Sequence, residues 1–242
     1  MTIMSKDPRL LAEEVCRKVA RGGDRRYYRV GRTGRWYGGI ATADCCGCNL
    51  RCVFCWSNHP RDHPETGRFW SPEEVAETLI RKAREKEYRQ VRISGNEPTI
   101  ACEHLLAVID IVDSANLHFI LETNGILIDQ EFARRLRVFK NLHVRVSIKG
   151  TNEREFERLT ETSGVGFHQQ IEALNHLLKE GISCHPAVMV SFSKGDRLFE
   201  LKRRLARIDP YLTRVLEEES AILYPHVRRR LAKRGFEVRS QL

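Results

Sequence analysis

The sequence lacks any long apolar run. No stretch of the 242 residues approaches the roughly 20 consecutive apolar side chains that a membrane-spanning helix needs. The first residues also lack the basic start, apolar core and small-residue cleavage site of a secretory signal. We therefore expect a cytoplasmic protein with no membrane partner.

Internal repeats and low-complexity segments are absent as well, so the sequence indicates neither a repeat architecture nor a disordered chain. Hydrophobic residues make up 41% and charged residues 30% of the chain, which is typical of a globular protein with a heavily charged surface. The length is sufficient for a sizeable core, and we expect one α/β domain rather than two small ones.

Acidic residues are the minority charge, with 32 Asp and Glu against 41 Lys and Arg and a formal net charge of +9. This balance favours acidic partners such as nucleic acid or phosphorylated metabolites, and it is also typical of a surface suited to high temperature. Arginines alternate with aromatic residues between residues 25 and 37, as in a base-stacking surface or in a strand at the edge of a sheet. Because no named RNA-binding motif is present, we favour the strand.

Cysteines are concentrated in one place, since five of the eight lie between residues 45 and 55. Adjacent, closely spaced cysteines do not suit a disulfide framework and favour metal binding in a reducing compartment. Cys16, Cys102 and Cys184 are scattered, and we interpret them as small buried hydrophobic residues. Only two cysteines follow Cys55, so a C-terminal domain with additional clusters is not expected.

Cys48, Cys52 and Cys55 are separated by three and two residues. One tight loop with this spacing can bring three thiolates to neighbouring corners of a [4Fe-4S] cluster, which leaves one iron open to a cofactor or substrate. Cys45 adds a fourth thiol, so a closed four-cysteine zinc site or an electron-transfer cluster of ferredoxin type is the alternative. In a third interpretation, Cys45 and Cys46 are unliganded thiols packed beside the cluster.

Strands and helices alternate along the rest of the chain. We expect helices at residues 7–21, 72–86, 167–179 and 198–208, two more after residues 101 and 129, and strands at 36–43, 90–94, 117–121, 143–148 and 187–192. Ser71 and Glu74 form a predicted capping box, and Asp129 is the predicted cap of the helix that follows it. The alternation implies a parallel sheet with right-handed crossovers.

At the cysteine loop the chain resembles the radical S-adenosylmethionine (SAM) superfamily, whose mark is a C-x3-C-x2-C loop with an aromatic residue before the third cysteine, here Phe54. The turn at residues 95–98, Gly-Asn-Glu-Pro, resembles the G-G-E-P motif, with Asn96 in place of the second glycine. Residues 122–125, Glu-Thr-Asn-Gly, and residues 147–150, Ser-Ile-Lys-Gly, are similar to the D-T-N-G and D-L-K-G segments of glycyl-radical activating enzymes. Among the superfamily, the chain is most similar to the pyruvate formate-lyase activating enzymes.

The resemblance implies an open partial (β/α)6 TIM-like barrel of the radical SAM type over residues 36–226, with an N-terminal lead-in at 1–35 and a basic helix or tail at 227–242. It implies a [4Fe-4S] cluster held by the three spaced cysteines and S-adenosyl-L-methionine bound at the open iron. The expected cofactor contacts are Phe54, Gly95, Asn96, Glu97, Pro98, Glu122, Asn124, Ser147 and Lys149. The turn at 95–98 would take the ammonium group, and Lys149 with Ser147 would orient the carboxylate and ribose.

Such a protein would be an oxidoreductase that cleaves SAM reductively into methionine and a 5′-deoxyadenosyl radical, which abstracts hydrogen from a substrate. A ferredoxin- or flavodoxin-type donor would supply the electron. The open side of a short barrel suits a large partner, so we expect a protein or peptide substrate, as for the activating enzymes. RNA or a phosphorylated small molecule is one alternative, and a non-enzymatic zinc or cluster module is another.

Overall fold

The computed structural model describes residues 6–236. Within them nine strands form one sheet in the order β1-β2-β3-β5-β6-β7-β8-β9, and β4 pairs with β2 outside this path. The pairs from β3 through β5 to β9 are parallel, whereas β1, β2 and β4 pair in antiparallel fashion. The strands are β1 Ala20–Arg21, β2 Asp24–Gly34, β3 Ile40–Cys45, β4 Arg68–Trp70, β5 Gln90–Gly95, β6 His118–Thr123, β7 Leu142–Ile148, β8 Ser183–Met189 and β9 Glu217–Glu219. An open parallel sheet of this kind is the predicted partial barrel.

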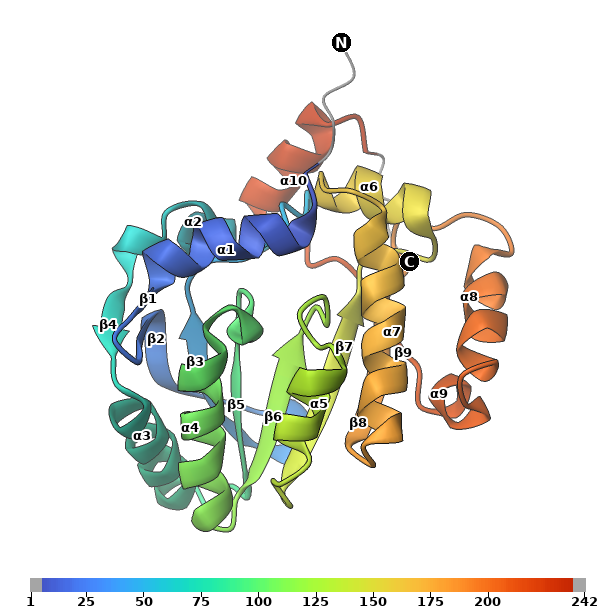
Figure 1. The fold of residues 1–242 in the computed structure, drawn as a ribbon. Helices are drawn as coiled ribbons and strands as arrows, with labels where there is room; N and C mark the ends of the chain where they lie inside the picture. Colours follow the sequence, from blue (N-terminus) through green and yellow to red (C-terminus); the bar gives the residue numbers. More distant parts are fainter. Residues whose placement is uncertain (1–5, 237–242) are drawn as a thin grey trace.

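Helices cover the outer face of the curved sheet, with α3, α4, α5 and α7 in a row outside the strands and α10 beside α6 at one end (Figure 1). The helices are α1 Pro8–Val19, α2 Asn58–Asp62, α3 Pro72–Glu85, α4 Cys102–Ser114, α5 Gln130–Leu136, α6 Glu153–Thr160, α7 Val165–Lys179, α8 Arg197–Ala206, α9 Pro210–Arg214 and α10 Pro225–Lys233. In the described part of the chain, no helix is both long and apolar enough to cross a lipid bilayer. The last residues of the predicted tail, 237–242, lie outside the described residues.

The parallel strands carry apolar side chains on the outer face and polar ones on the inner face. In β7, Val144, Val146 and Ile148 are fully buried in the main hydrophobic core. Arg145 and Ser147 alternate with them and line a cavity on the opposite side. Because strands of a parallel sheet are usually apolar on both faces, charged residues on the inner face indicate a barrel built to enclose polar contents.

Several predicted elements are confirmed at their ends. The Ser71–Glu74 capping box starts α3, with both reciprocal hydrogen bonds present. The Asp129 side chain accepts from the Phe132 N–H at the start of α5. Strand β7 and helix α7 begin within two residues of the positions that the hydrophobic periodicity predicts.

Two strand predictions are wrong in their bounds. The first parallel strand, β3, begins at Ile40 instead of residue 36, because Trp36–Gly38 forms a 3-10 turn. Three successive residues from Tyr37 have positive φ, and such a run does not continue an extended strand. β8 starts at Ser183, where its pairing with β7 begins, and it ends at Met189 although the apolar run continues to residue 192.

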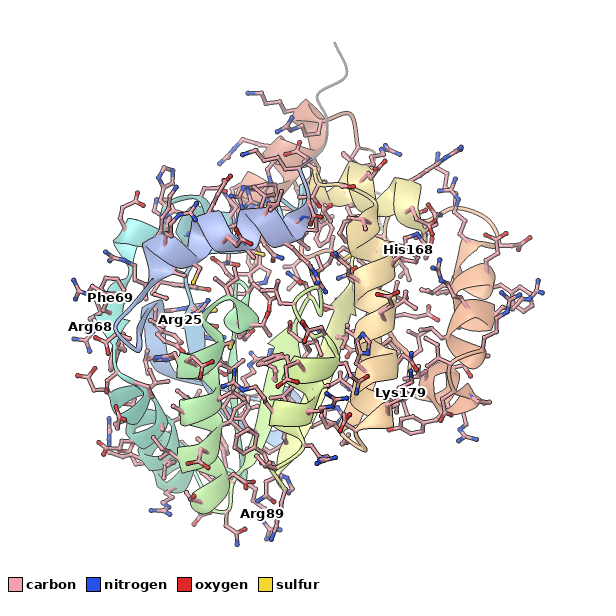
Figure 2. All side chains as sticks on the ribbon, in the orientation of Figure 1. Arg25, Arg68, Phe69, Arg89, His168 and Lys179 are labelled. Carbon is pink, nitrogen blue, oxygen red and sulfur yellow. The ribbon has the colours of Figure 1, made fainter. Side chains whose placement is uncertain are left out.

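Most of the arginine- and aromatic-rich segment forms the long strand β2, as predicted, but β2 is not an edge strand over its first residues. It pairs with β3 along one edge and, at residues 25–27, with β4 along the other. Arg25 points inward from this strand and is only 1% exposed (Figure 2). Its guanidinium donates to the carbonyls of Cys46, Glu97 and Pro98 at 3.2, 2.7 and 2.8 Å.

His104, near the start of α4, links this helix to the start of β2 through two hydrogen bonds. Its Nδ1 lies 2.9 Å from the Gly23 carbonyl oxygen and must donate to it, so Nε2 accepts from the Tyr27 hydroxyl at 3.0 Å. Burial lowers the pKa of His104 to about 4, although the hydrogen bond to Gly23 opposes the shift. The folded protein therefore holds this imidazole in the neutral form.

We expect His104 to make the protein less stable in mild acid. Between about pH 6.5 and pH 4 the unfolded chain binds a proton that the folded chain does not, so the free energy of unfolding decreases as the pH falls through this window. In the His104→Gln variant, the decrease between pH 6.5 and 4 should be smaller than in the parent protein. Urea unfolding at several pH values measures it, and an unchanged slope would contradict the assignment.

Candidate active site

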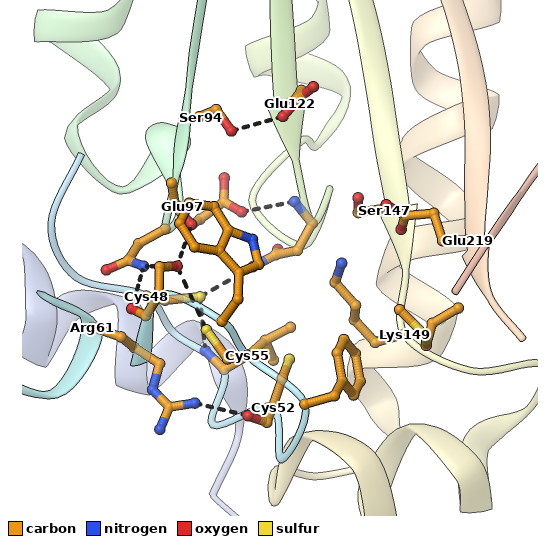
Figure 3. Close-up of a pocket in the computed structure, with 18 of the residues that line it drawn as sticks. Cys48, Cys52, Cys55, Arg61, Ser94, Glu97, Glu122, Ser147, Lys149 and Glu219 are labelled. Carbon is orange, nitrogen blue, oxygen red and sulfur yellow. Dashed lines mark hydrogen bonds between the residues drawn. The ribbon is translucent and has the colours of Figure 1, made fainter. Parts of the chain in front are cut away.

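A cavity of about 210 Å³ opens at the carboxyl ends of the parallel strands. Every predicted site residue except Pro98 lines it, so segments from residue 48 to residue 149 meet there (Figure 3). Residues that sequence reasoning did not single out complete the wall: Leu50, Trp56, Ser57, Arg61, Ser94, Thr123, Arg145, Met189, Glu219, Ser220, Ala221 and Ile222. Of these, Arg145 had a usable signal, because polar residues alternate with valines along its strand.

The cysteine loop follows β3 and is tied to the end of α6. The N–H groups of Arg51 and Val53 donate to the carbonyls of Thr160 and Leu159 at 2.9 and 2.8 Å. Cys48, Cys52 and Cys55 all line the cavity, and Figure 3 shows their sulfur atoms gathered at its lower end. The loop thus has the shape needed to present three thiolates to one metal cluster.

Cys45 and Cys46 do not line this cavity. Both are fully buried: Cys45 belongs to the main core, and Cys46 packs in a smaller apolar cluster with Val15 and Val19 of α1. Burial raises the pKa of Cys46 to about 12, which keeps its thiol neutral. This placement supports the interpretation of the two residues as unliganded thiols.

The turn after β5 presents backbone and amide acceptors to the cavity. Gly95 has φ +98°, and a Cβ there would lie 3.1 Å from Asp44 Cα and from the Cys45 nitrogen, so only glycine fits. The Asn96 amide nitrogen donates to the Ser57 carbonyl at 3.2 Å and to its Oγ at 3.0 Å. The Asn96 Oδ1 atom is buried and has no hydrogen-bond partner within the described residues.

Glu97 supports this turn from within. Its carboxylate is 1% exposed and accepts four hydrogen bonds, from the Thr99 N–H and hydroxyl, the Thr123 hydroxyl and the Asn124 N–H, at 2.6–3.1 Å. Pro98 lies behind the turn, with its carbonyl bonded to Arg25. Atoms of Gly95 and Asn96 are therefore better placed than Glu97 and Pro98 to meet a ligand's ammonium group.

The opposite wall is a network of paired charges. Glu122 accepts from Arg92 and Ser94 at 2.7 Å each and from Tyr37 at 3.0 Å. Burial acts to raise the pKa of Glu122, but the charges of Arg92 and Arg145 and these hydrogen bonds outweigh it, so the pKa is lowered. The carboxylate is therefore ionised at neutral pH.

Arg145 is held by two carboxylates from the edge strand β9. Its Nε and Nη2 atoms lie 2.9 and 2.7 Å from oxygens of Glu217 and Glu219, and its Nη1 donates to the Ser147 hydroxyl at 2.9 Å. Lys149 differs, because its ammonium makes no hydrogen bond or ion pair within residues 6–236. Figure 3 shows this ammonium directed into the cavity.

These residues fit the cofactors that the resemblance implies. Three cysteine sulfurs at one end suit a [4Fe-4S] cluster with one open iron. Beside them, the unpartnered Asn96 Oδ1 can accept from an ammonium and the unpaired Lys149 can bind a carboxylate, which are the two charged groups of the methionine moiety of SAM. An orphan acceptor and an orphan cation in one buried cavity indicate a zwitterionic ligand.

Comparisons with known proteins agree with this geometry. The family model of the Radical SAM superfamily matches residues 44–196. The chain is 27% identical over 113 residues to a probable GTP 3′,8-cyclase of Methanococcus maripaludis, covering 47% of this chain and 37% of that protein. It is 28% identical over 164 residues to the mycofactocin maturase MftC of Mycolicibacterium smegmatis, covering 66% of this chain and 39% of that protein. The chain thus spans less than half the length of these relatives.

A solved structure shares the fold. SuiB of Streptococcus suis, bound to the precursor peptide SuiA, has a TM-score of 0.62 at 16% identity, covering 76% of this chain and 39% of that chain. The family match covers more than half of the 242 residues and includes the three cysteines at the cavity. The chain belongs to the radical SAM superfamily.

Proposed function

We propose that this protein, which as a radical SAM enzyme uses a [4Fe-4S] cluster and SAM, removes a hydrogen atom from a peptide or protein. When bound and reduced, the cluster supplies the electron that cleaves SAM into methionine and a 5′-deoxyadenosyl radical. Cys48, Cys52 and Cys55 are assigned as the cluster ligands. The polypeptide's other tasks are to orient SAM, exclude water and hold the substrate beside it.

The roles around SAM follow from the acceptors and donors that line the cavity. The Gly95 carbonyl already accepts from the Ser57 hydroxyl at 2.9 Å and has a second lone pair to offer. Asn96 and the Gly95 carbonyl are assigned to the ammonium, and Lys149 to the carboxylate. Phe54 is 8% exposed and stacks on Phe192 with ring centroids 5.7 Å apart, which gives the cavity a flat apolar wall for the adenine. Glu122, Asn124 and Ser147 border the space that is left for the ribose and the substrate.

The charged side chains that line the cavity are the main evidence for the substrate class. Its cationic side chains are Arg61, Arg145 and Lys149, and three glutamates line it as well. Arg145 is paired with Glu217 and Glu219, and Arg61 is paired with Asp62 at 2.8 Å. Since Lys149 is assigned to SAM, no unpaired cation of the lining remains for a di- or triphosphate. A polar but uncharged segment such as a peptide backbone suits this interior better.

The rim of the cavity favours the same substrate class. Trp56 and Ile222 line it and are 38% and 50% exposed, and Tyr224 nearby in the chain is 48% exposed. Exposed apolar and aromatic side chains around a cavity mark a surface for a partner protein or peptide. The peptide bound in the SuiB structure shows that this fold can hold such a substrate.

A phosphorylated substrate is the second candidate. The net charge of +9 and the similarity to probable GTP 3′,8-cyclases favour it. Assignment to the narrower group of glycyl-radical activating enzymes depends on the sequence motifs alone, since the relatives reported above are a cyclase and a maturase. A ferredoxin- or flavodoxin-type electron donor and a cytoplasmic location are part of the same proposal.

We expect the cysteine variants to separate the metal ligands from the packed thiols. Cys48→Ala, Cys52→Ala and Cys55→Ala should each lose the cluster and all SAM cleavage, because a three-thiolate site has no spare ligand. Cys46→Ala and Cys45→Ala should retain both. Iron analysis and 5′-deoxyadenosine formation after anaerobic reconstitution measure the difference. Loss of iron in Cys45→Ala as complete as in the other three would instead indicate a closed four-thiolate site.

Lys149→Met should weaken SAM binding by roughly tenfold or more, because a charge-assisted hydrogen bond contributes about 1.5–3 kcal/mol. Calorimetric titration of the reconstituted protein with SAM measures the dissociation constant. Lys179→Met is the matched control, since Lys179 is exposed on α7, away from the cavity (Figure 2). Equal affinity in the two variants would show that Lys149 is an ordinary solvated lysine.

Isotope transfer tests the substrate class. The reduced enzyme is given SAM and the protein and peptide fraction of cells grown in heavy water, and 5′-deoxyadenosine is analysed by mass spectrometry. Deuterium should appear in this product, and prior protease digestion of the fraction should remove the transfer. Deuterium transfer from labelled GTP or from protease-resistant RNA would overturn the peptide assignment, and RNA binding would also weaken steeply with salt.

A further inference from the structure

The three cysteines at the cavity share a feature of their backbone. Each of their carbonyl oxygens accepts a hydrogen bond from a different arginine. Nη1 of Arg51 donates to Cys48 at 2.6 Å, Nη1 of Arg61 donates to Cys52 at 3.0 Å, and Nη2 of Arg230 donates to Cys55. Figure 3 shows the bond between Arg61 and Cys52. We name Arg51, Arg61 and Arg230 the arginine collar.

The collar is assembled from separate parts of the chain. Arg51 belongs to the cysteine loop itself, Arg61 comes from α2, and Arg230 comes from α10, about 175 residues farther along the sequence. Each also has a second contact: Arg51 with the Leu50 carbonyl, Arg61 with Asp62, and Arg230 with the Val53 carbonyl at 2.7 Å. The same guanidinium of Arg230 thus spans two carbonyls of the loop with donors held in one rigid plane, a geometry that a flexible lysine side chain does not fix.

Helix α10 is attached to the loop at a second point. The His226 ring nitrogen Nε2 lies 3.0 Å from the Trp56 carbonyl oxygen and donates to it. Val227 and Leu231 of α10 are buried in the main core. This packing anchors the helix, so that Arg230 holds the loop against a fixed element. One arginine of the basic helix predicted after residue 226, Arg230, therefore reaches the cysteine loop.

The collar also places positive charge beside the thiolates. The guanidinium groups of Arg51, Arg61 and Arg230 bond the backbone of the same residues whose sulfur atoms line the cavity, so each cation lies close to a thiolate. Each step of cluster reduction adds one negative charge, and nearby cations and hydrogen bonds stabilise the more negative state. Cationic side chains held against all three ligand residues therefore favour the reduced cluster.

We propose that the arginine collar fixes the cysteine loop and raises the reduction potential of its cluster, with Arg230 as a positioning residue supplied by the C-terminal helix. This role goes beyond the proposed function and depends on neither the peptide nor any other substrate. It assigns to α10 a task at the metal site, in place of a purely structural one.

The test is a redox titration of the reconstituted protein without SAM or substrate, followed by the paramagnetic signal of the reduced cluster. Arg230→Gln should titrate at a more negative midpoint potential than the parent, and Arg230→Lys should recover part of the difference. Arg229→Gln is the matched control, since Arg229 is exposed on the same helix and the substitution removes the same charge. Equal midpoint potentials for Arg230→Gln and Arg229→Gln would overturn the proposal.

A second variant keeps the test decisive if Arg230→Gln does not retain a cluster. Arg51→Gln alters the collar within the loop and touches no helix packing, and it should shift the midpoint potential in the same direction. SAM cleavage with a limiting reductant should fall roughly 10- to 100-fold in either variant, as is usual when partners of metal ligands are removed. A parent-like potential in Arg51→Gln, with Arg230→Gln unable to bind iron, would reduce the collar to a structural support and refute its effect on the potential.

Discussion

A single buried guanidinium joins the two halves of the site. Arg25 donates to carbonyls of Cys46, just before the cluster loop, and of Glu97 and Pro98 in the turn on the next parallel strand. Without it three carbonyls in a solvent-free region would lose their donor, at a cost of about 1–3 kcal/mol for each buried group left unpaired. The carboxylate of Glu97 balances this charge while it binds the end of β6 through Asn124. The relative position of the cysteine loop and the turn at residues 95–98 therefore depends on this buried pair of charges.

Paired charges also line the inner face of the barrel. Arg92 pairs with Glu122, and Arg145 pairs with Glu217 and Glu219 of β9, at 2.7–2.9 Å. Such pairs add little net stability, because their desolvation costs about as much as their attraction returns. What they provide is a polar interior whose charges are already satisfied. Within residues 6–236, the Asn96 oxygen and the Lys149 ammonium have no partner and are therefore available to an entering ligand.

The sequence predicts the parts of this arrangement that are local. The spacing of the cysteines, the glycine turn after β5 and the lysine after β7 each have a short-range signal, and parallel strands bring their ends together in a known way. Arg61, Arg230 and Glu219 have no such signal, because a basic or acidic residue in a charged segment looks the same whether it is solvated or bound to the loop. The displaced starts of β3 and β8 have a similar origin. A turn at Trp36–Gly38 delays β3, and pairing with β7 brings β8 forward, whereas the apolar pattern records only which residues are buried.

Two of the residues that support the cluster loop, Arg25 and Arg230, lie outside the segment that matches the superfamily, whereas Arg51 and Arg61 lie within it. The match covers residues 44–196 and includes the cysteines, the cofactor turn and Lys149. Arg25 precedes it, and Arg230 follows it. The N-terminal helix also precedes the match and contacts the loop. The Asn49 amide donates to the Pro8 carbonyl at 3.2 Å, and Val15 and Val19 lie against Gly47. Arg25 and Arg230 donate to carbonyls in and beside the loop, while the N-terminal helix supplies an acceptor, the Pro8 carbonyl, for the Asn49 amide. The functional unit is therefore wider than the family match, because the matched segment carries the ligands while the flanking segments hold them in place.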